Sequence, residues 1–171
     1  YPMNISAICP VFNEEASVGE VLADLRKHLQ DNPRVGQFEI ILVDDGSEDL
    51  TSVKAGQVPE ITVLKNDTRK GYGAALKRGI SRARYEIILI IDGDGTYPLD
   101  ALDQMLELIQ NSDMVVGERE LKQSDYPLTK RLGKGILNLM VFALAGRKIR
   151  DLNSGLRLMR KDWVIPFFPI I

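Results

Sequence analysis

Hydrophobic residues in the first two thirds of the chain form short continuous runs separated by segments with helical spacing. Continuous runs of this kind are typical of strands buried on both faces; they cover residues 5–11, 38–43, 61–64, 86–91 and 114–116. Apolar residues spaced three or four apart predict helices over residues 18–29, 73–83 and 98–110. Alternating strands and helices of this length predict an α/β fold, a three-layer sandwich with a mostly parallel sheet.

Polar side chains follow three of the predicted strands. In a parallel sheet, ligands bind beyond the carboxyl ends of the strands. We therefore expect the three clusters to face one crevice. The clusters are Asn13-Glu14-Glu15, Asp44-Asp45, and Asp92 with Asp94.

Asp92 and Asp94 form an Asp-x-Asp step directly after the most apolar strand. Residues two apart in an extended chain point to the same side, so the two carboxylates converge. Paired carboxylates suit a hard divalent cation such as Mg²⁺ or Mn²⁺. The pattern also fits a solvated loop in which Gly93 and Gly95 make the turn, and the motif alone leaves both interpretations open.

The other two clusters each allow a structural and a functional interpretation. Asp44 and Asp45 suit either a turn after the strand or contacts to a nucleotide. Glu14 suits either the first turn of a helix, where the helix dipole favours acidic residues, or a ligand site. Lys70 precedes a helix and could meet a phosphate, although a solvated position is the more ordinary one for a basic residue. The chain has neither a Walker-type phosphate loop nor a dinucleotide-binding Gly-x-Gly-x-x-Gly after its first strand.

Composition narrows the class of protein. The 171 residues are 44% hydrophobic and 27% charged, as in an ordinary globular domain. With 22 basic and 24 acidic residues, the chain lacks the basic excess of a nucleic-acid-binding protein. Cys9 and His28 are the only cysteine and the only histidine, which excludes internal disulfides and cysteine-rich zinc sites. These features, and the lack of an apolar run of about 18 residues, indicate a reducing, cytosolic compartment.

The composition changes after about residue 118. Residues 126–150 hold six basic residues and no acidic one. Within this stretch, residues 136–145 are almost entirely apolar and suit either a core helix or a helix at a membrane surface. Residues 163–171 contain no polar side chain, so we expect the chain to be part of a longer protein.

Taken in order, these motifs resemble family-2 glycosyltransferases of the GT-A fold. The resemblance covers the chain from about Ile5 to Arg160 and first rests on Pro10-Val-Phe-Asn-Glu14, Val43-Asp-Asp-Gly-Ser47 and Asp92-Gly-Asp94. Later segments are similar to the dolichyl- or polyprenyl-phosphate sugar synthases. These segments are Val115-Val-Gly-Glu-Arg119, Arg131, and Asp151-Leu-Asn-Ser-Gly155-Leu-Arg157.

The resemblance implies a single catalytic domain, with a nucleotide-sugar half over 1–118 and an acceptor half over 119–171. The implied donor-nucleotide residues are Pro10, Phe12, Glu14, Asp44, Asp45, Asp92 and Gly93, and Lys70 would add a phosphate contact. Asp92 and Asp94 would hold Mg²⁺ or Mn²⁺ and the donor diphosphate. Arg119 and Arg131 would bind the acceptor phosphate, with Ser154 and Arg157 beside them. Thr96 and Gly135 depart from the family pattern, in which an amide and a serine are common.

The implied reaction is a single inverting displacement at the sugar's anomeric carbon. A hydroxyl acceptor needs a general base, whereas a lipid phosphate is already ionised; the acid-free stretch 126–150 favours the phosphate. A lipid acceptor and a cytosolic donor together imply that the enzyme associates with the cytosolic face of a membrane. Two alternatives stay open: a family-2 transferase with a hydroxyl acceptor and Asp151 as base, and a receiver-type signalling module.

Overall fold

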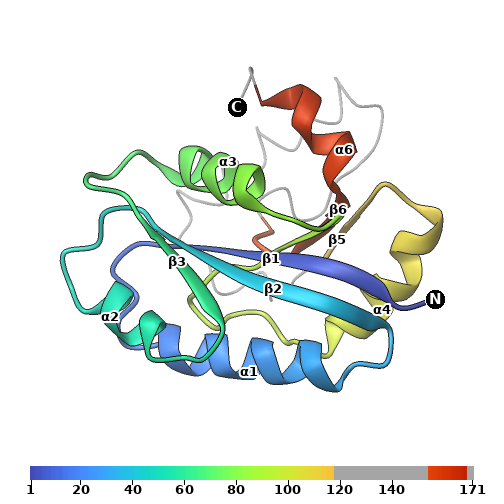
Figure 1. The fold of residues 1–171 in the computed structure, drawn as a ribbon, viewed down its shortest axis with the longest axis horizontal. Helices are drawn as coiled ribbons and strands as arrows, with labels where there is room; N and C mark the ends of the chain where they lie inside the picture. Colours follow the sequence, from blue (N-terminus) through green and yellow to red (C-terminus); the bar gives the residue numbers. More distant parts are fainter. Residues whose placement is uncertain (118–153, 169–171) are drawn as a thin grey trace, which may run out of the picture. The chain divides into compact units, whose positions relative to one another are not determined.

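The structure is a computed structural model, and it describes residues 1–117 and 154–168 (Figure 1). The predictions that concern Arg119, Arg131, Gly135 and the apolar segment 136–145 lie outside the described residues. The helices and strands below belong to one unit made of residues 1–116 and 155–171.

A six-stranded sheet forms the centre of this unit, in the order β3-β2-β1-β4-β6-β5. The strands are β1 (Met3–Val11), β2 (Val35–Asp44), β3 (Ile61–Lys65), β4 (Ile87–Ile90), β5 (Met114–Val116) and β6 (Arg157–Arg160). Pairings among β1, β2, β3 and β4 are parallel, whereas β6 runs antiparallel to both β4 and β5. The prediction of a mostly parallel α/β sheet is confirmed.

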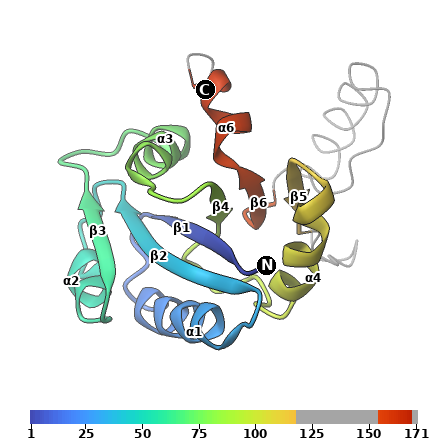
Figure 2. The same ribbon diagram turned by 45° about the vertical axis from the view of Figure 1, so that its right-hand side comes forward.

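Helices cover both faces of the sheet, as Figures 1 and 2 show from two directions. The α1 and α2 helices lie on one face and α3 lies on the other. The helices are α1 (Val18–Asp31), α2 (Thr51–Gly56), α3 (Tyr72–Arg82), α4 (Ala101–Leu108) and α6 (Lys161–Val164), with single 3₁₀ turns at Ile109–Asn111 and Ile165–Phe167. This arrangement gives the three layers expected from the alternating pattern.

The two cores follow from the alternation of side chains along β1. Ile5, Ala7 and Cys9 point to one face, where they pack against the apolar stripe of α1. That stripe consists of Val18, Leu22, Leu25 and Leu29, all at most 1% exposed. Ile8 points to the other face, where it joins a cluster that includes Ile80 of α3. Both faces of β1 are therefore buried, which explains its continuous apolar run.

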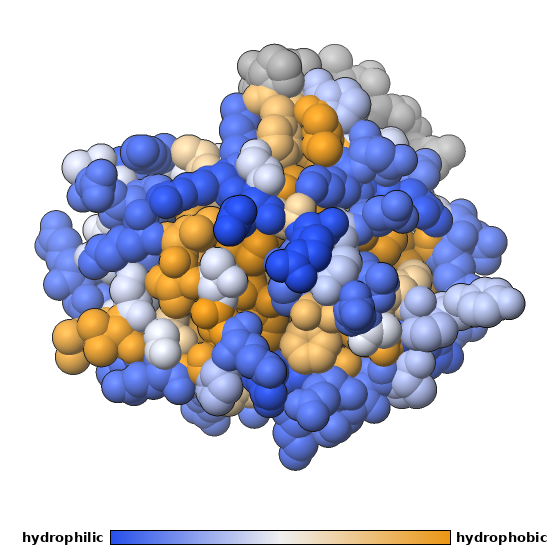
Figure 3. All heavy atoms as spheres, in the orientation of Figure 1, coloured by the Kyte–Doolittle hydropathy of each residue, from blue (hydrophilic) through white to orange (hydrophobic). Residues whose placement is uncertain are grey.

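The elements that were not predicted from the pattern are α2, β6, α6 and the 3₁₀ turn at Ile165–Phe167. The α2 helix has six residues; Leu50 just before it is 56% exposed and Val53 within it is 57% exposed. Figure 3 shows hydrophobic side chains reaching the surface over α2 and β3. Within 1–117 and 154–168, no helix is long and apolar enough to cross a membrane.

Candidate functional site

The carboxyl ends of β1, β2 and β4 meet at a cavity of about 280 Å³. The residues that line it come from all three polar clusters and from the start of α3: Pro10, Val11, Phe12, Glu14, Asp45, Arg69, Tyr72, Ala75, Asp92, Gly93 and Asp94. The parallel pairing of β1 with both β2 and β4 brings these strand ends together. Each of the three clusters thus contributes to one cavity, through Glu14, Asp45, Asp92 and Asp94, whereas Asn13, Glu15 and Asp44 do not line it.

The two carboxylates of the Asp-x-Asp step are held by different partners. Asp92 Oδ1 accepts a hydrogen bond from the Tyr72 hydroxyl at 3.0 Å. Asp94 Oδ1 accepts hydrogen bonds from Thr96, from the backbone N at 3.0 Å and from Oγ1 at 2.8 Å. Thr96 thus orients Asp94 through a tight local turn, aided by the positive φ of 71° at Gly95.

Two glycines allow the backbone to pack tightly around these carboxylates. A Cβ atom on Gly93 would lie 2.4 Å from Val11 Cγ1. A Cβ atom on Gly155 would lie 1.7 Å from Asp92 Oδ2. The backbone N of Gly155 also donates a hydrogen bond to the Tyr97 hydroxyl. The chain entering β6 therefore packs directly against the Asp92 carboxylate.

Asp45 anchors the loop that leads into α3. Its carboxylate accepts hydrogen bonds from Asn66 Nδ2 at 2.8 Å, Lys70 N at 2.8 Å and Gly71 N at 2.7 Å. Burial alone raises the pKa of a carboxyl, but these three donors and the charge of Arg69 together lower the pKa of Asp45 below its ordinary value. Asp45 lines the cavity while its oxygens hold the loop in place.

Asp44 does not line the cavity. Its side chain is fully buried, and its oxygens accept hydrogen bonds from Ser47 N at 2.7 Å and from the Ser52 hydroxyl. Neighbouring strand residues point to opposite faces, so Asp44 turns inward where Asp45 turns toward the cavity. The prediction that Asp44 contacts a nucleotide is corrected to a structural role in the turn after β2.

Arg69, rather than Lys70, reaches the cavity. The Arg69 guanidinium lies 4.0 Å from the centre of the Phe12 ring, in cation–π geometry. The Lys70 side chain is exposed and does not line the cavity; only its backbone N takes part, as a donor to Asp45. A basic residue before a helix was a signal in the sequence, but the pattern could not tell which of the two faces inward.

The loop after β1 is fastened to the turn after β2 and to the Asp-x-Asp loop. Asn13 N donates to Ser47 Oγ at 2.9 Å, and Asn13 itself has a positive φ of 56°. Ser17 Oγ donates to the Gly93 carbonyl at 3.0 Å and lies 3.2 Å from Glu14 Oε2. Ser17 makes no capping bond to α1. These bonds hold Glu14 at the cavity wall.

Two of the residues expected beside the acceptor are described. Arg157 is half-buried at the start of β6, opposite Ile90 of β4. Burial and the Asp92 carboxylate raise the pKa of Tyr72, and the positive charge of Arg157 partly offsets this rise. Ser154 is buried, and its hydroxyl donates to the Gly117 carbonyl. Their roles toward an acceptor stay predictions.

The donor atoms around the cavity are hard oxygens. In the parts of the chain that the structure describes, no group of three or more histidine, cysteine or acidic residues is arranged to hold a metal ion. Cys9 lies beneath the cavity, and burial, together with the charges of Asp92, Asp94 and Glu14, raises the pKa of its thiol to about 12. A neutral thiol is a poor metal ligand, so Asp92 and Asp94 are the candidate ligands.

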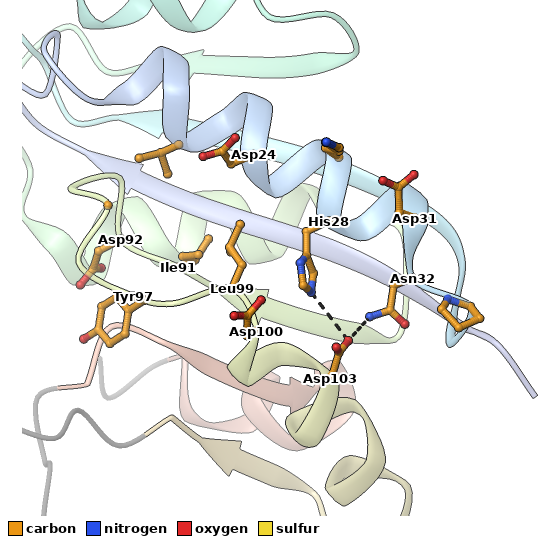
Figure 4. Close-up of a pocket in the computed structure, with 14 residues that line it drawn as sticks. Asp24, His28, Asp31, Asn32, Ile91, Asp92, Tyr97, Leu99, Asp100 and Asp103 are labelled. Atoms are coloured by element: carbon orange, nitrogen blue, oxygen red, sulfur yellow. Dashed lines mark hydrogen bonds and ion pairs between the residues drawn. The ribbon is translucent and has the colours of Figure 1, made fainter.

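A second hollow, of about 530 Å³, lies between α1 and the loop after β4 (Figure 4). Its polar residues include Asp103, whose carboxylate accepts a hydrogen bond from Asn32 and lies 3.7 Å from His28 Nε2. Asp92 borders both hollows, so the loop that carries the two aspartates forms the wall between them. Of the predicted site residues within 1–117 and 154–168, only Asp92 lines this second hollow.

The sheet order and the cavity at its carboxyl edge define the GT-A class of fold, shared with solved glycosyltransferase structures. One such structure is glucosyl-3-phosphoglycerate synthase from Mycobacterium tuberculosis with Mn²⁺, UDP-glucose and phosphoglyceric acid. It matches with a TM-score of 0.73 and 20% identity, over 95% of this chain and 58% of that one. A receiver module has a different, wholly parallel strand order, and that alternative is excluded.

The chain belongs to glycosyl transferase family 2, whose family model matches residues 6–167. Dolichol-phosphate mannosyltransferase of Pyrococcus furiosus is 31% identical over 95% of this chain and 47% of its own length. Undecaprenyl-phosphate mannosyltransferase of Micrococcus luteus is 27% identical over 94% of this chain and 68% of its own length. The chain thus spans about half to two thirds of the length of these relatives.

Proposed function

We propose that the chain is the catalytic domain of an inverting glycosyltransferase that moves a sugar from a nucleotide diphosphate sugar to a polyprenyl phosphate. The observation that carries this proposal is one cavity that joins a Phe12–Arg69 wall to the paired carboxylates Asp92 and Asp94. Such a cavity suits a ligand with a flat ring at one end and a diphosphate at the other. Relatives named as dolichol-phosphate and undecaprenyl-phosphate mannosyltransferases support the choice of acceptor.

The nucleoside end of the donor would lie against Phe12 and Arg69. An aromatic ring and a guanidinium plane both offer flat surfaces for a base. Ser17 contacts both the Glu14 carboxylate and the Gly93 carbonyl and so holds Glu14 at the cavity wall. The Glu14 carboxylate oxygens can accept hydrogen bonds from ribose hydroxyls. Asp45 contributes indirectly, because it fixes the loop that presents Arg69.

Asp92 and Asp94 fit a divalent cation of the Mg²⁺ or Mn²⁺ type. Two carboxylates are fewer ligands than such an ion needs, which leaves positions for phosphate oxygens and water, as is usual for Mg²⁺ sites. A bound ion would neutralise the charge that develops on the leaving diphosphate. The Thr96 turn and the Tyr72 hydroxyl hold the two carboxylates for this task.

Transfer would need no proton acceptor from the protein. An ionised oxygen of the acceptor phosphate attacks the anomeric carbon from the face opposite the diphosphate. The carbon–oxygen bond to the diphosphate breaks, and its electron pair leaves with the nucleoside diphosphate, so the configuration inverts. Arg157, together with the predicted Arg119 and Arg131, would bind the acceptor phosphate by charge-assisted hydrogen bonds. The lipid acceptor implies action at the cytosolic face of a membrane.

One experiment tests the proposed function and its competitors together. The full-length protein is incubated with labelled UDP- and GDP-sugars, Mg²⁺ or Mn²⁺, and one of three acceptors. The acceptors are polyprenyl phosphate, a small phosphorylated acid such as phosphoglyceric acid, and an oligosaccharide with free hydroxyls. We expect label in the lipid phase, and none in the presence of a chelator. Label only on the small acid or on the oligosaccharide would overturn the lipid acceptor.

A further inference from the structure

Tyr72 is the first residue of α3, and its hydroxyl reaches from the helix start to the first aspartate of the Asp-x-Asp step. The hydroxyl donates to Asp92 Oδ1 at 3.0 Å, although Tyr72 as a residue is 50% exposed. The preceding Gly71 has a φ of 95°, and its backbone N is held by Asp45. The anchored loop therefore fixes the point from which the Tyr72 ring projects.

The opposite side of the Asp92 carboxylate meets backbone. A Cβ atom on Gly155 would fall within 2.7 Å of all three carboxylate atoms. The carboxylate is therefore confined between the α3 start on one side and the chain entering β6 on the other. These two contacts come from segments far apart in the sequence, and both converge on the same functional group.

We propose that Tyr72 is a positioning residue, whose hydroxyl sets the orientation of the Asp92 carboxylate toward the donor diphosphate and its cation. This inference rests on the proposed function. The terminal torsion of an aspartate is broad, so a carboxylate needs such a partner to hold one orientation. The Tyr72 hydroxyl can only donate to an ionised carboxylate, so its bond fixes Oδ1 in the direction of the start of α3.

A purely structural role for the hydroxyl makes a different prediction. A phenylalanine in place of Tyr72 keeps the ring and its packing and removes only the bond to Asp92. If the bond merely stabilised the fold, its loss would lower the melting temperature and leave cation affinity unchanged. If the bond positions Asp92, its loss weakens cation and donor affinity while the melting temperature changes little, because the ring lies at the surface.

The test compares Tyr72→Phe with Tyr85→Phe, a matched loss of one hydroxyl. The Tyr85 hydroxyl bonds to Gln37 at 3.4 Å and lies outside the cavity lining. Mn²⁺ affinity is measured on the full-length protein by electron paramagnetic resonance with UDP or GDP present. A charge-assisted hydrogen bond at a half-exposed site predicts roughly 5- to 30-fold weaker Mn²⁺ binding in Tyr72→Phe. For Tyr85→Phe we expect less than about a twofold change, because a surface hydroxyl remote from the cavity has no path to the cation.

A double-mutant cycle with Asp92→Asn then shows whether Tyr72 acts through Asp92. Residues that act as a unit are non-additive, so Tyr72→Phe is expected to add less than about a twofold loss in the Asp92→Asn background. Equal Mn²⁺ affinity in Tyr72→Phe and the parent protein would overturn the positioning role alone. If the parent itself bound no Mn²⁺ with either nucleotide, both the positioning role and the proposed function would be overturned.

Discussion

Replacing Gly155 by alanine tests how closely the site depends on the chain entering β6. The added Cβ would lie 1.7 Å from Asp92 Oδ2 and 2.2 Å from its Cγ. Ordinary contact at this position begins near 3.4 Å, so either the carboxylate or the β6 entry must move by well over an ångström. Overpacking of this kind typically costs about 1–3 kcal/mol of folding free energy, which lowers the melting temperature of a protein of this size by roughly 2–12 °C.

The effect on activity is expected to exceed the effect on stability. A displacement of about 1 Å at a reacting site can cost on the order of 100-fold in rate, and the added Cβ would overlap the Asp92 carboxylate directly. We therefore expect kcat/KM for the donor to fall by about 100-fold or more in Gly155→Ala at a temperature where the protein stays folded. Nucleotide-dependent Mn²⁺ affinity should fall with it.

Gly19→Ala is the matched control, because a Cβ there meets nothing within 4 Å and Gly19 lies in the first turn of α1. Alanine suits a helix better than glycine by roughly 0.5–1 kcal/mol, so this variant should be as stable as the parent or slightly more so, with unchanged kinetics. Differential scanning fluorimetry and initial-rate assays on the three proteins complete the comparison. Full activity and unaltered Mn²⁺ affinity in Gly155→Ala would refute the argument that Gly155 confines Asp92.

Three further outcomes are expected. Asp94→Ala should lose roughly 100-fold or more in transfer rate, and no excess of Mg²⁺ should restore it; a fully active variant would favour the solvated-loop interpretation. Because the folded-state pKa of Asp45 is lowered, its stabilising contribution is present above the unfolded pKa near 4 and is lost as pH falls through the folded value. Asp45→Asn should therefore be less stable at pH 7 and show a flatter acid limb in pH-dependent urea unfolding; equal curves would contradict this. Arg131→Lys keeps the charge but loses the planar fork, so the acceptor kcat/KM should drop by about 10-fold or more while donor affinity, measured by calorimetry, stays constant.

The strands next to the site were predictable because a strand buried on both faces has a continuous run of apolar residues in the sequence. Continuous apolar runs located β1, β2 and β4, and the parallel arrangement then placed their polar ends together without further information. The β6 strand has no such apolar run. Its four residues, Arg-Leu-Met-Arg, are too few to show a period, and its antiparallel pairing depends on contacts with β4 and β5.

The limits of prediction within the site have a similar cause. Asp44 and Asp45 are neighbours in sequence and similar in chemistry, and only the direction in which the end of β2 faces decides which one reaches the cavity. Tyr72 carried no signal, because an exposed aromatic at a helix start is ordinary. Its importance comes from the Asp45 bonds that set where α3 begins, and these bonds join residues that no local pattern connects.

The insertion of β6 between β4 and β5 has a consequence for how the protein assembles. In the described sheet, β5 pairs with β6 and not with β4, so β5 has no strand partner until the much later segment 157–160 has been synthesised. Strand pairs that close long loops form slowly. The β3-β2-β1-β4 half of the sheet can form early on the ribosome. The β6 and β5 strands can pair only after residues 157–160 have been synthesised. Since Gly155 lies just before β6, we expect the Asp92 carboxylate of a nascent chain to become confined only when β6 joins the described sheet.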